Sequence, residues 1–138
     1  GDAVKINGQY IMYVTEGCGG KQYVGTSDNM IDWKFEQKNF IDISSLGNTL
    51  ELTCAIPEEN GDDLVIDFFY NNKNNEFATG QAYYKKSEPY KQLAIGTGGS
   101  VAWGGLIQYK GKWIVGSGWD AAEGSNTMLF YTAPVKKK

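Results

Sequence analysis

A tight turn, Asn60-Gly61-Asp62-Asp63, leads directly into the apolar run Leu64-Val65-Ile66-Asp67-Phe68-Phe69-Tyr70 near the middle of the chain. The same order of turn, glycine and aromatic or aliphatic run occurs at Asn7-Gly8-Gln9-Tyr10-Ile11-Met12-Tyr13-Val14 and at Lys110-Gly111-Lys112-Trp113-Ile114-Val115. The three glycines lie 53 and 50 residues apart. A period near 50 residues is typical of antiparallel propeller blades and too long for helical solenoids. The sequence therefore predicts about three β-propeller blades.

Composition agrees with an all-β chain of 138 residues, because 14% aromatic residues and 18 glycines suit many short strands joined by turns. Apolar residues do not recur at helical spacing over three turns. We expect a single domain, residues 1–138, with blades at about 1–48, 49–97 and 98–135. A propeller closes with four to eight blades, so we expect a part of a longer propeller or completion by a homo-oligomer. A closed β-barrel built from simple hairpins is the alternative fold.

The charge and hydropathy of the chain limit the classes of partner that we expect it to bind. The net charge is −3 and no basic stripe is present, which argues against nucleic-acid binding. No apolar run approaches the roughly 20 residues that cross a bilayer, so we expect no membrane partner. A leader could precede Gly1, and we expect a secreted, periplasmic or cell-surface location. Cys18 and Cys54 are compatible with one disulfide or with two thiols.

The chain contains no histidine, which excludes His-based catalytic triads and His metal sites. Asp28, Asn29 and Asp32 have the spacing of a weak calcium-loop pattern, but turn capping accounts for them better. The glycine-rich segments 17–20 and 96–99 lack the Lys-Ser/Thr pair of a phosphate-binding loop. We therefore expect no cofactor and no metal.

Several motifs resemble those of the five-bladed propeller glycoside hydrolases of families 32 and 43. In that clan a blade opens with Asp-Pro-x-Val, continues through Gly-Lys-Tyr-Tyr and closes with Ser-x-Asp-Leu-x-x-Trp. The corresponding stretches here are Asp2-Ala3-Val4, Asn7-Gly8-Gln9-Tyr10 and Thr26-Ser27-Asp28-Asn29-Met30-Ile31-Asp32-Trp33. The order of Asp2, Cys54 and Gly118-Trp119 is most similar to family 32. The resemblance implies a glycan of the fructan, arabinan or xylan type as ligand or substrate.

The resemblance also implies catalytic positions. Asp2 matches the carboxylate that stabilises the oxocarbenium-like transition state. The family's acid glutamate would fall at Thr53, whose hydroxyl is too weak an acid. Glu51 lies two residues earlier and, by strand alternation, on the same face, so it is the candidate acid, with an ordinary surface glutamate as the alternative. The family's Asn-Asp-Pro-Asn nucleophile motif is absent from the chain. A glycosidase and a non-catalytic sugar-binding or assembly module therefore both stay open.

Tryptophans supply the candidate sugar platform, because a rigid apolar ring complements the C–H face of a sugar. We expect Trp103 and Trp119, with Asp120 beside them, to bind substrate, and core packing is the alternative for each tryptophan. Trp33 is expected to pack between blades. Alternation predicts one face of the strand 49–56, on which Leu50, Leu52, Cys54 and Ile56 lie, and an opposite face that carries Glu51, Thr53 and Ala55. Asp67, within an apolar run, is expected to be paired rather than catalytic.

Overall fold

The computed structural model of this protein describes residues 2–17, 20–98, 105–117 and 129–135. Within these residues the chain forms eleven strands and no helix, and all strand pairs are antiparallel. None of the described elements is therefore a helix that could cross a membrane. The all-β prediction is confirmed.

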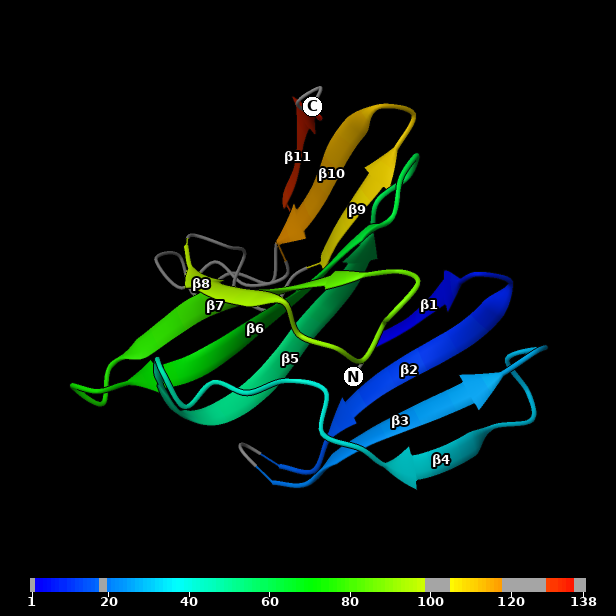
Figure 1. The fold of residues 1–138 in the computed structure, drawn as a ribbon. Helices are drawn as coiled ribbons and strands as arrows, with labels where there is room; N and C mark the ends of the chain where they lie inside the picture. Colours follow the sequence, from blue (N-terminus) through cyan, green and yellow to red (C-terminus); the bar gives the residue numbers. More distant parts are fainter. Residues whose placement is uncertain (1, 18–19, 99–104, 118–128, 136–138) are drawn as a thin grey trace.

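The strands form three separate sheets, each built from consecutive strands (Figure 1). Sheet 1 contains β1 (Asp2–Ile6), β2 (Gln9–Thr15), β3 (Gln22–Ser27) and β4 (Lys34–Gln37). Sheet 2 contains β5 (Gly47–Pro57), β6 (Asp63–Asn72), β7 (Phe77–Lys85) and β8 (Ala94–Thr97). Sheet 3 contains β9 (Gly105–Tyr109), β10 (Lys112–Ser117) and β11 (Leu129–Pro134).

The first strand of each sheet lies at the centre of the molecule. In Figure 1, β1, β5 and β9 run in the same direction, and the sheets fan outward from them. A 260 Å³ cavity between these strands is lined by residues 3–5, 55–57 and 106–108. Blades around a shared axis have this arrangement, so the closed-barrel alternative is wrong. We call the end at which the three inner strands begin the mouth, and the opposite end the base.

Two of the three glycine turns have the backbone of tight hairpins. Asn7 and Gly8 have φ of 51° and 81°, and Lys110 and Gly111 have φ of 49° and 74°. Two consecutive residues with positive φ define the type I′ hairpin, whose twist matches that of the strands, and glycine takes the second position without strain. The turn at Gly61 differs, since it is a longer connection between β5 and β6.

The core lies between sheets 1 and 2. It is formed by large apolar side chains from both sheets and from the connector between them, among them Ile11, Tyr13, Val24, Phe40, Leu50, Leu64, Ile66, Phe68, Tyr70 and Tyr84. Two of the core tyrosines donate to backbone carbonyls: Tyr13 to Pro89 at 2.7 Å and Tyr84 to Phe40 at 2.7 Å. Burial raises the pKa of Tyr13 and of Tyr84 far above its usual value. Both hydroxyls therefore stay protonated donors.

Two glutamine side chains hold the connector between the sheets, residues 38–46. Gln22 accepts from the amides of Phe40 (2.8 Å) and Ile41 (3.0 Å) and donates to the Ile41 carbonyl at 2.7 Å. Gln92 accepts from the Asp42 amide at 2.8 Å and donates to the Asp42 carbonyl at 3.1 Å. Each primary amide imitates a strand partner, so the connector is fixed in place without belonging to a sheet.

Sheet 3 is fastened to sheet 2 at the base. The Glu59 carboxylate accepts from the amides of Lys110 (2.6 Å) and Gly111 (3.0 Å), and the Gln108 side chain accepts from the Glu59 amide at 3.1 Å. Beside this contact lies a 430 Å³ cavity lined mainly by apolar side chains, including Ile56, Val65 and the half-buried Trp113. The interface between sheets 2 and 3 is therefore held by polar contacts at the base and contains an unfilled cavity.

Two local expectations can be compared with the structure. Asp67 is buried and accepts from the Gln81 side chain at 2.9 Å, so the prediction of a paired aspartate is confirmed. Trp33 does not pack between the described blades; it lies 6.1 Å from Phe35 of its own sheet, and its indole N–H donates to the Met30 carbonyl.

Candidate functional site

The mouth is where the candidate catalytic positions lie. Asp2 is the first residue of β1 and pairs with Tyr13, while the half-buried Glu51 lies within β5 opposite Phe69. In the axial cavity, residues 3–5 lie against residues 55–57. Asp2 is therefore one residue from that level and Glu51 four, which offsets their backbones by roughly 10 Å along the axis. Their pairing as two catalytic carboxyl groups stays a prediction.

A β-bulge changes the faces of β5. The β5–β6 register shifts between Leu52 and Cys54, so Thr53 is an extra residue without a partner position. Ala55 consequently joins Leu50 in the core between sheets 1 and 2, whereas Cys54 and Ile56 are buried outside that cluster. The predicted alternation is therefore wrong beyond Leu52, because a bulge reverses the faces of every residue that follows it. The inference that Glu51 shares a face with Thr53 by period two loses its basis.

Thr53 itself carries an unusual polar atom. Its Oγ1 is buried and has no hydrogen-bond partner among the described residues. An unsatisfied buried hydroxyl costs about 1–3 kcal/mol. The position at which the resemblance to family 32 places an acid glutamate thus holds a buried hydroxyl with no polar partner in the described part of the chain.

The predicted sugar-binding residues Trp103, Trp119 and Asp120 lie outside the described residues, as does Cys18. In the sequence, Trp103 precedes β9 by two positions and Trp119 follows β10 by two. Their roles stay predictions. Cys54 is buried in β5, and its bridge to Cys18 is an open question of the same kind.

A polar pocket opens where β5 begins. It has a volume of 320 Å³ and is lined by Gly20, Gln22, Ile41, Asp42, Ile43, Ser44, Gly47, Asn48, Thr49 and Leu50. Asp42 is exposed, and the 2.9 Å hydrogen bond from the Ser44 amide holds the pKa of its carboxyl below the usual value. An ionised carboxylate, an amide and two hydroxyls therefore face one space at the mouth.

The backbone beside this pocket is strained. Thr49 has φ of 53°, in the left-handed region that a β-branched residue seldom adopts, and it lies at a second register shift of β5. A side chain at Gly47 would come within 1.9 Å of the Asn71 carbonyl oxygen, so the chain needs glycine there. Strain of about 1–3 kcal/mol is found preferentially at functional sites, and bulges re-aim side chains next to them. Both features support the start of β5 as a functional surface.

Sequence reasoning missed this pocket. Ser44-Ser45 and Gly47-Asn48 have the composition of ordinary turns, and Asp42 has no motif of its own. The relevant signal is the dense run of Asp, Ser, Gly, Asn and Thr from 42 to 49, which can supply both donors and acceptors. Such a set can bind hydroxyl groups.

Hydrolysis of a glycosidic bond needs more than this set of groups. It needs a second carboxyl group at a defined distance from the first, about 5 Å in retaining and 6.5–9.5 Å in inverting enzymes.

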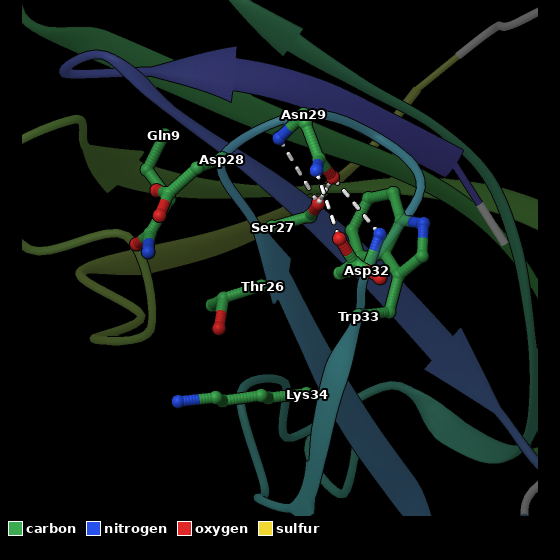
Figure 2. Close-up of a pocket in the computed structure, with 8 residues that line it drawn as sticks. All are labelled: Gln9, Thr26, Ser27, Asp28, Asn29, Asp32, Trp33 and Lys34. Carbon is green, nitrogen blue, oxygen red and sulfur yellow. Dashed lines mark hydrogen bonds between the residues drawn. The ribbon is translucent and has the colours of Figure 1, made fainter.

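A second polar region lies at the base, on the turn between β3 and β4 (Figure 2). The Asn29 Oδ1 accepts from the amides of Ile31 (2.8 Å) and Asp32 (2.9 Å), and its Nδ2 donates to Asp32 at 3.0 Å. The Ser27 hydroxyl accepts from the amides of Asn29 (3.2 Å) and Met30 (2.9 Å). These bonds confirm the prediction of turn capping. Among the described residues, no group of three or more His, Cys, Asp and Glu side chains is placed to hold a metal ion.

Comparison with known proteins supports the fold. No protein-family model matches the chain, and no curated protein matches it. A solved structure described as a thermostable family-43 glycoside hydrolase is similar, with a TM-score of 0.62 and 12% sequence identity. The chain has a propeller-like fold. The match covers 98% of this chain and 47% of that one, so the chain spans about half the length of that protein. At this identity the likeness concerns the fold, and it singles out neither family 32 nor family 43.

Proposed function

We propose that this chain is part of a carbohydrate-active propeller that holds a glycan at the mouth. The observation that carries this proposal is that β1, β5 and β9 run in one direction around a shared cavity, and that a polar pocket around Asp42 lies where β5 begins. Open α/β folds and barrels bind ligands at the ends of their strands, and a propeller offers the same kind of site around its axis. The similarity to a longer glycoside hydrolase supports a glycan as the ligand class.

The proposed chemistry follows from the mixture of groups. Asp42, Asn48 and Thr49 would bind sugar hydroxyls, since a carboxylate accepts and an amide both donates and accepts. Asp2 would oppose the positive charge that develops on the sugar ring, and Glu51 would be the acid. Fructans, arabinans and xylans are the proposed substrates. Polymers of this size do not cross membranes, which favours a secreted, periplasmic or cell-surface location.

Hydrolysis assays test the proposal directly. The chain should release sugar from sucrose, levan or an aryl arabinoside, and Asp2→Asn and Glu51→Gln should each lower the rate at least 100-fold. Glu76→Gln is the matched control, because Glu76 is exposed on the β6–β7 loop. Turnover that survives both substitutions would remove these residues from the mechanism.

A non-catalytic sugar-binding or assembly module is the second candidate. Thr53 favours it, because a buried hydroxyl occupies the position of the family's acid. Calorimetry with fructan, arabinan and xylan oligosaccharides separates the two: binding without sugar release, weakened by Asp42→Asn, supports the module. Absence of both binding and turnover would contradict the two candidates together. A measurement of solution mass tests completion of the ring by a homo-oligomer.

A further inference from the structure

The β3–β4 turn carries a pocket at the base, away from the mouth. Because neighbouring strands of sheet 1 are antiparallel, β3 runs in the same direction as β1 and its last residue, Ser27, lies at the base. The pocket has a volume of 370 Å³ and is lined by Gln9, Thr26, Ser27, Asp28, Asn29, Asp32, Trp33 and Lys34. This volume is within the usual range of small-molecule sites.

The eight lining residues fall into two groups. Ser27, Asn29, Asp32 and Trp33 use their side chains to fix the turn. Gln9, Thr26, Asp28 and Lys34 differ from them. Within the described part of the chain, the side chains of this second group make no hydrogen bond and no ion pair.

The second group gathers on one side of the turn. Figure 2 shows the side chains of Gln9, Asp28, Thr26 and Lys34 extending to the same side, with the Trp33 ring on the other. Thr26 and Lys34 occupy directly opposed positions of β3 and β4, which fixes them side by side. Hydrogen bonds fix the turn itself, while the four side chains of the second group have no polar partner among the described residues. A ligand would therefore meet a preorganised backbone and would have to order only side chains.

Charge selects the ligand class. An anion would be repelled by the carboxylates of Asp28 and Asp32, and the Lys34 ammonium group offsets part of their attraction for a cation. Asp28 and Lys34 face one pocket without forming an ion pair, which leaves an acceptor and a donor set apart. A sugar hydroxyl both donates and accepts, as do the Gln9 amide and the Thr26 hydroxyl. We propose that this pocket binds a neutral saccharide unit, as a second glycan site separate from the mouth.

The site is expected to be weak and auxiliary. Gln9, Asp28 and Lys34 are exposed, so binding must restrict three flexible side chains in competition with water. We expect a Kd on the order of 1 mM for a single sugar unit. Such a site would hold a polymeric glycan near the mouth by a second contact, which raises the effective concentration of the chain segment.

Titration of the ¹⁵N-labelled chain with xylose, arabinose, fructose and their trisaccharides tests the proposal. At least one neutral sugar should shift the backbone amides of residues 26–34 in a saturable manner. Asp28→Asn and Lys34→Gln should each weaken that binding at least fivefold while the shifts that report the Asn29 turn stay in place. Glu76→Gln and Lys73→Gln are the matched controls, because both residues are exposed on the β6–β7 loop.

Three results would overturn the proposal. No saturable shift of residues 26–34 at 50-fold the expected Kd, on the order of 50 mM sugar, would remove the site. Tighter binding of glucuronate or glucosamine than of the neutral sugars would overturn the ligand class. Unchanged affinity in both Asp28→Asn and Lys34→Gln would remove the assigned contacts. Shifts of residues 42–50, and their response to Asp42→Asn, report the mouth separately, so failure of one site is distinguishable from failure of the other.

Discussion

The two interfaces between the three sheets are built differently. Between sheets 1 and 2, aromatic and aliphatic side chains form a closed core, and Tyr13 and Tyr84 cross it to reach backbone carbonyls. Between sheets 2 and 3, the Glu59 carboxylate ties the β9–β10 turn at the base, next to a 430 Å³ cavity. The first interface is filled by buried apolar side chains, whereas the second, over the described residues, combines the Glu59 hydrogen bonds with an unfilled space.

This difference indicates where stability and adaptability lie. Burial of apolar surface contributes about 25 cal/mol per Å², so the filled interface should dominate the free energy of unfolding. The second interface combines hydrogen bonds to a charged group with an unfilled space, and it should open at lower cost. Sheet 3 is thus expected to be the most adjustable blade of the described chain.

The largest expected effect on stability comes from truncating one aromatic side chain at each of the two interfaces. Phe68 is fully buried and contacts Tyr70, with ring centroids 5.8 Å apart, so Phe68→Ala should lower the free energy of unfolding by about 3–5 kcal/mol. Trp113→Ala should cost about half as much or less, because Trp113 is half-buried and already borders a cavity. Urea denaturation of both variants measures this. Equal losses would show that the two interfaces contribute alike.

Alkaline pH should weaken the first interface selectively. In the unfolded chain a tyrosine loses its proton near pH 10, while burial raises the pKa of Tyr13 and Tyr84 in the folded state. The folded state then binds more protons, so stability is complete below pH 10 and falls as pH rises above it. Each tyrosine contributes a slope of up to about 1.4 kcal/mol per pH unit. Denaturant midpoints between pH 9 and 11 measure the slope.

The matched control for the alkaline effect is Tyr13→Phe/Tyr84→Phe. This double variant should be less stable at neutral pH, because each lost hydroxyl leaves a buried carbonyl without its donor. Its stability should nevertheless depend less steeply on pH above 10. A slope identical to that of the unsubstituted chain would assign the alkaline loss to other groups.

Removal of the polar tie should loosen only the second interface. Glu59→Ala deletes the acceptor for the Lys110 and Gly111 amides, at a cost of about 1–2 kcal/mol. Hydrogen exchange at these amides should accelerate about tenfold, while exchange in β6 stays unchanged. The control is Glu76→Ala. Equal acceleration in β6 would mean that sheet 3 unfolds together with the core.

The smallest expected effect concerns the bulge in β5. Thr53→Val replaces a buried hydroxyl that has no described partner, and it should raise the free energy of unfolding by about 1 kcal/mol. Thr79→Val is the comparison, because the Thr79 hydroxyl donates to the Gly98 carbonyl and its loss should destabilise the chain. Thermal melts of both variants suffice. A destabilised Thr53→Val would reveal a polar contact of Thr53 outside the described residues.

Much of the fold was predictable from local patterns. Glycine turns and apolar runs identify β2, β6 and β10, one strand in each sheet, because turn chemistry and period-two burial depend on neighbouring residues. The bulges at Thr49 and Thr53 were not, since an extra residue leaves no mark in the alternation of the sequence. The faces assigned beyond Leu52 were therefore wrong. The pocket of Asp42 was missed for a related reason, because it depends on Gln22 and Gln92, which are distant in sequence from the connector.

The long-range polar contacts of Tyr13, Tyr84, Gln22, Gln92 and Glu59 share one property: each reaches main-chain atoms of another segment. Every residue except proline offers the same amide and carbonyl. The residues that contribute these main-chain atoms can therefore be substituted without loss of the hydrogen bonds. Such contacts are compatible with a similar fold at low sequence identity, and this chain is similar to a solved structure over 98% of its length at 12% identity.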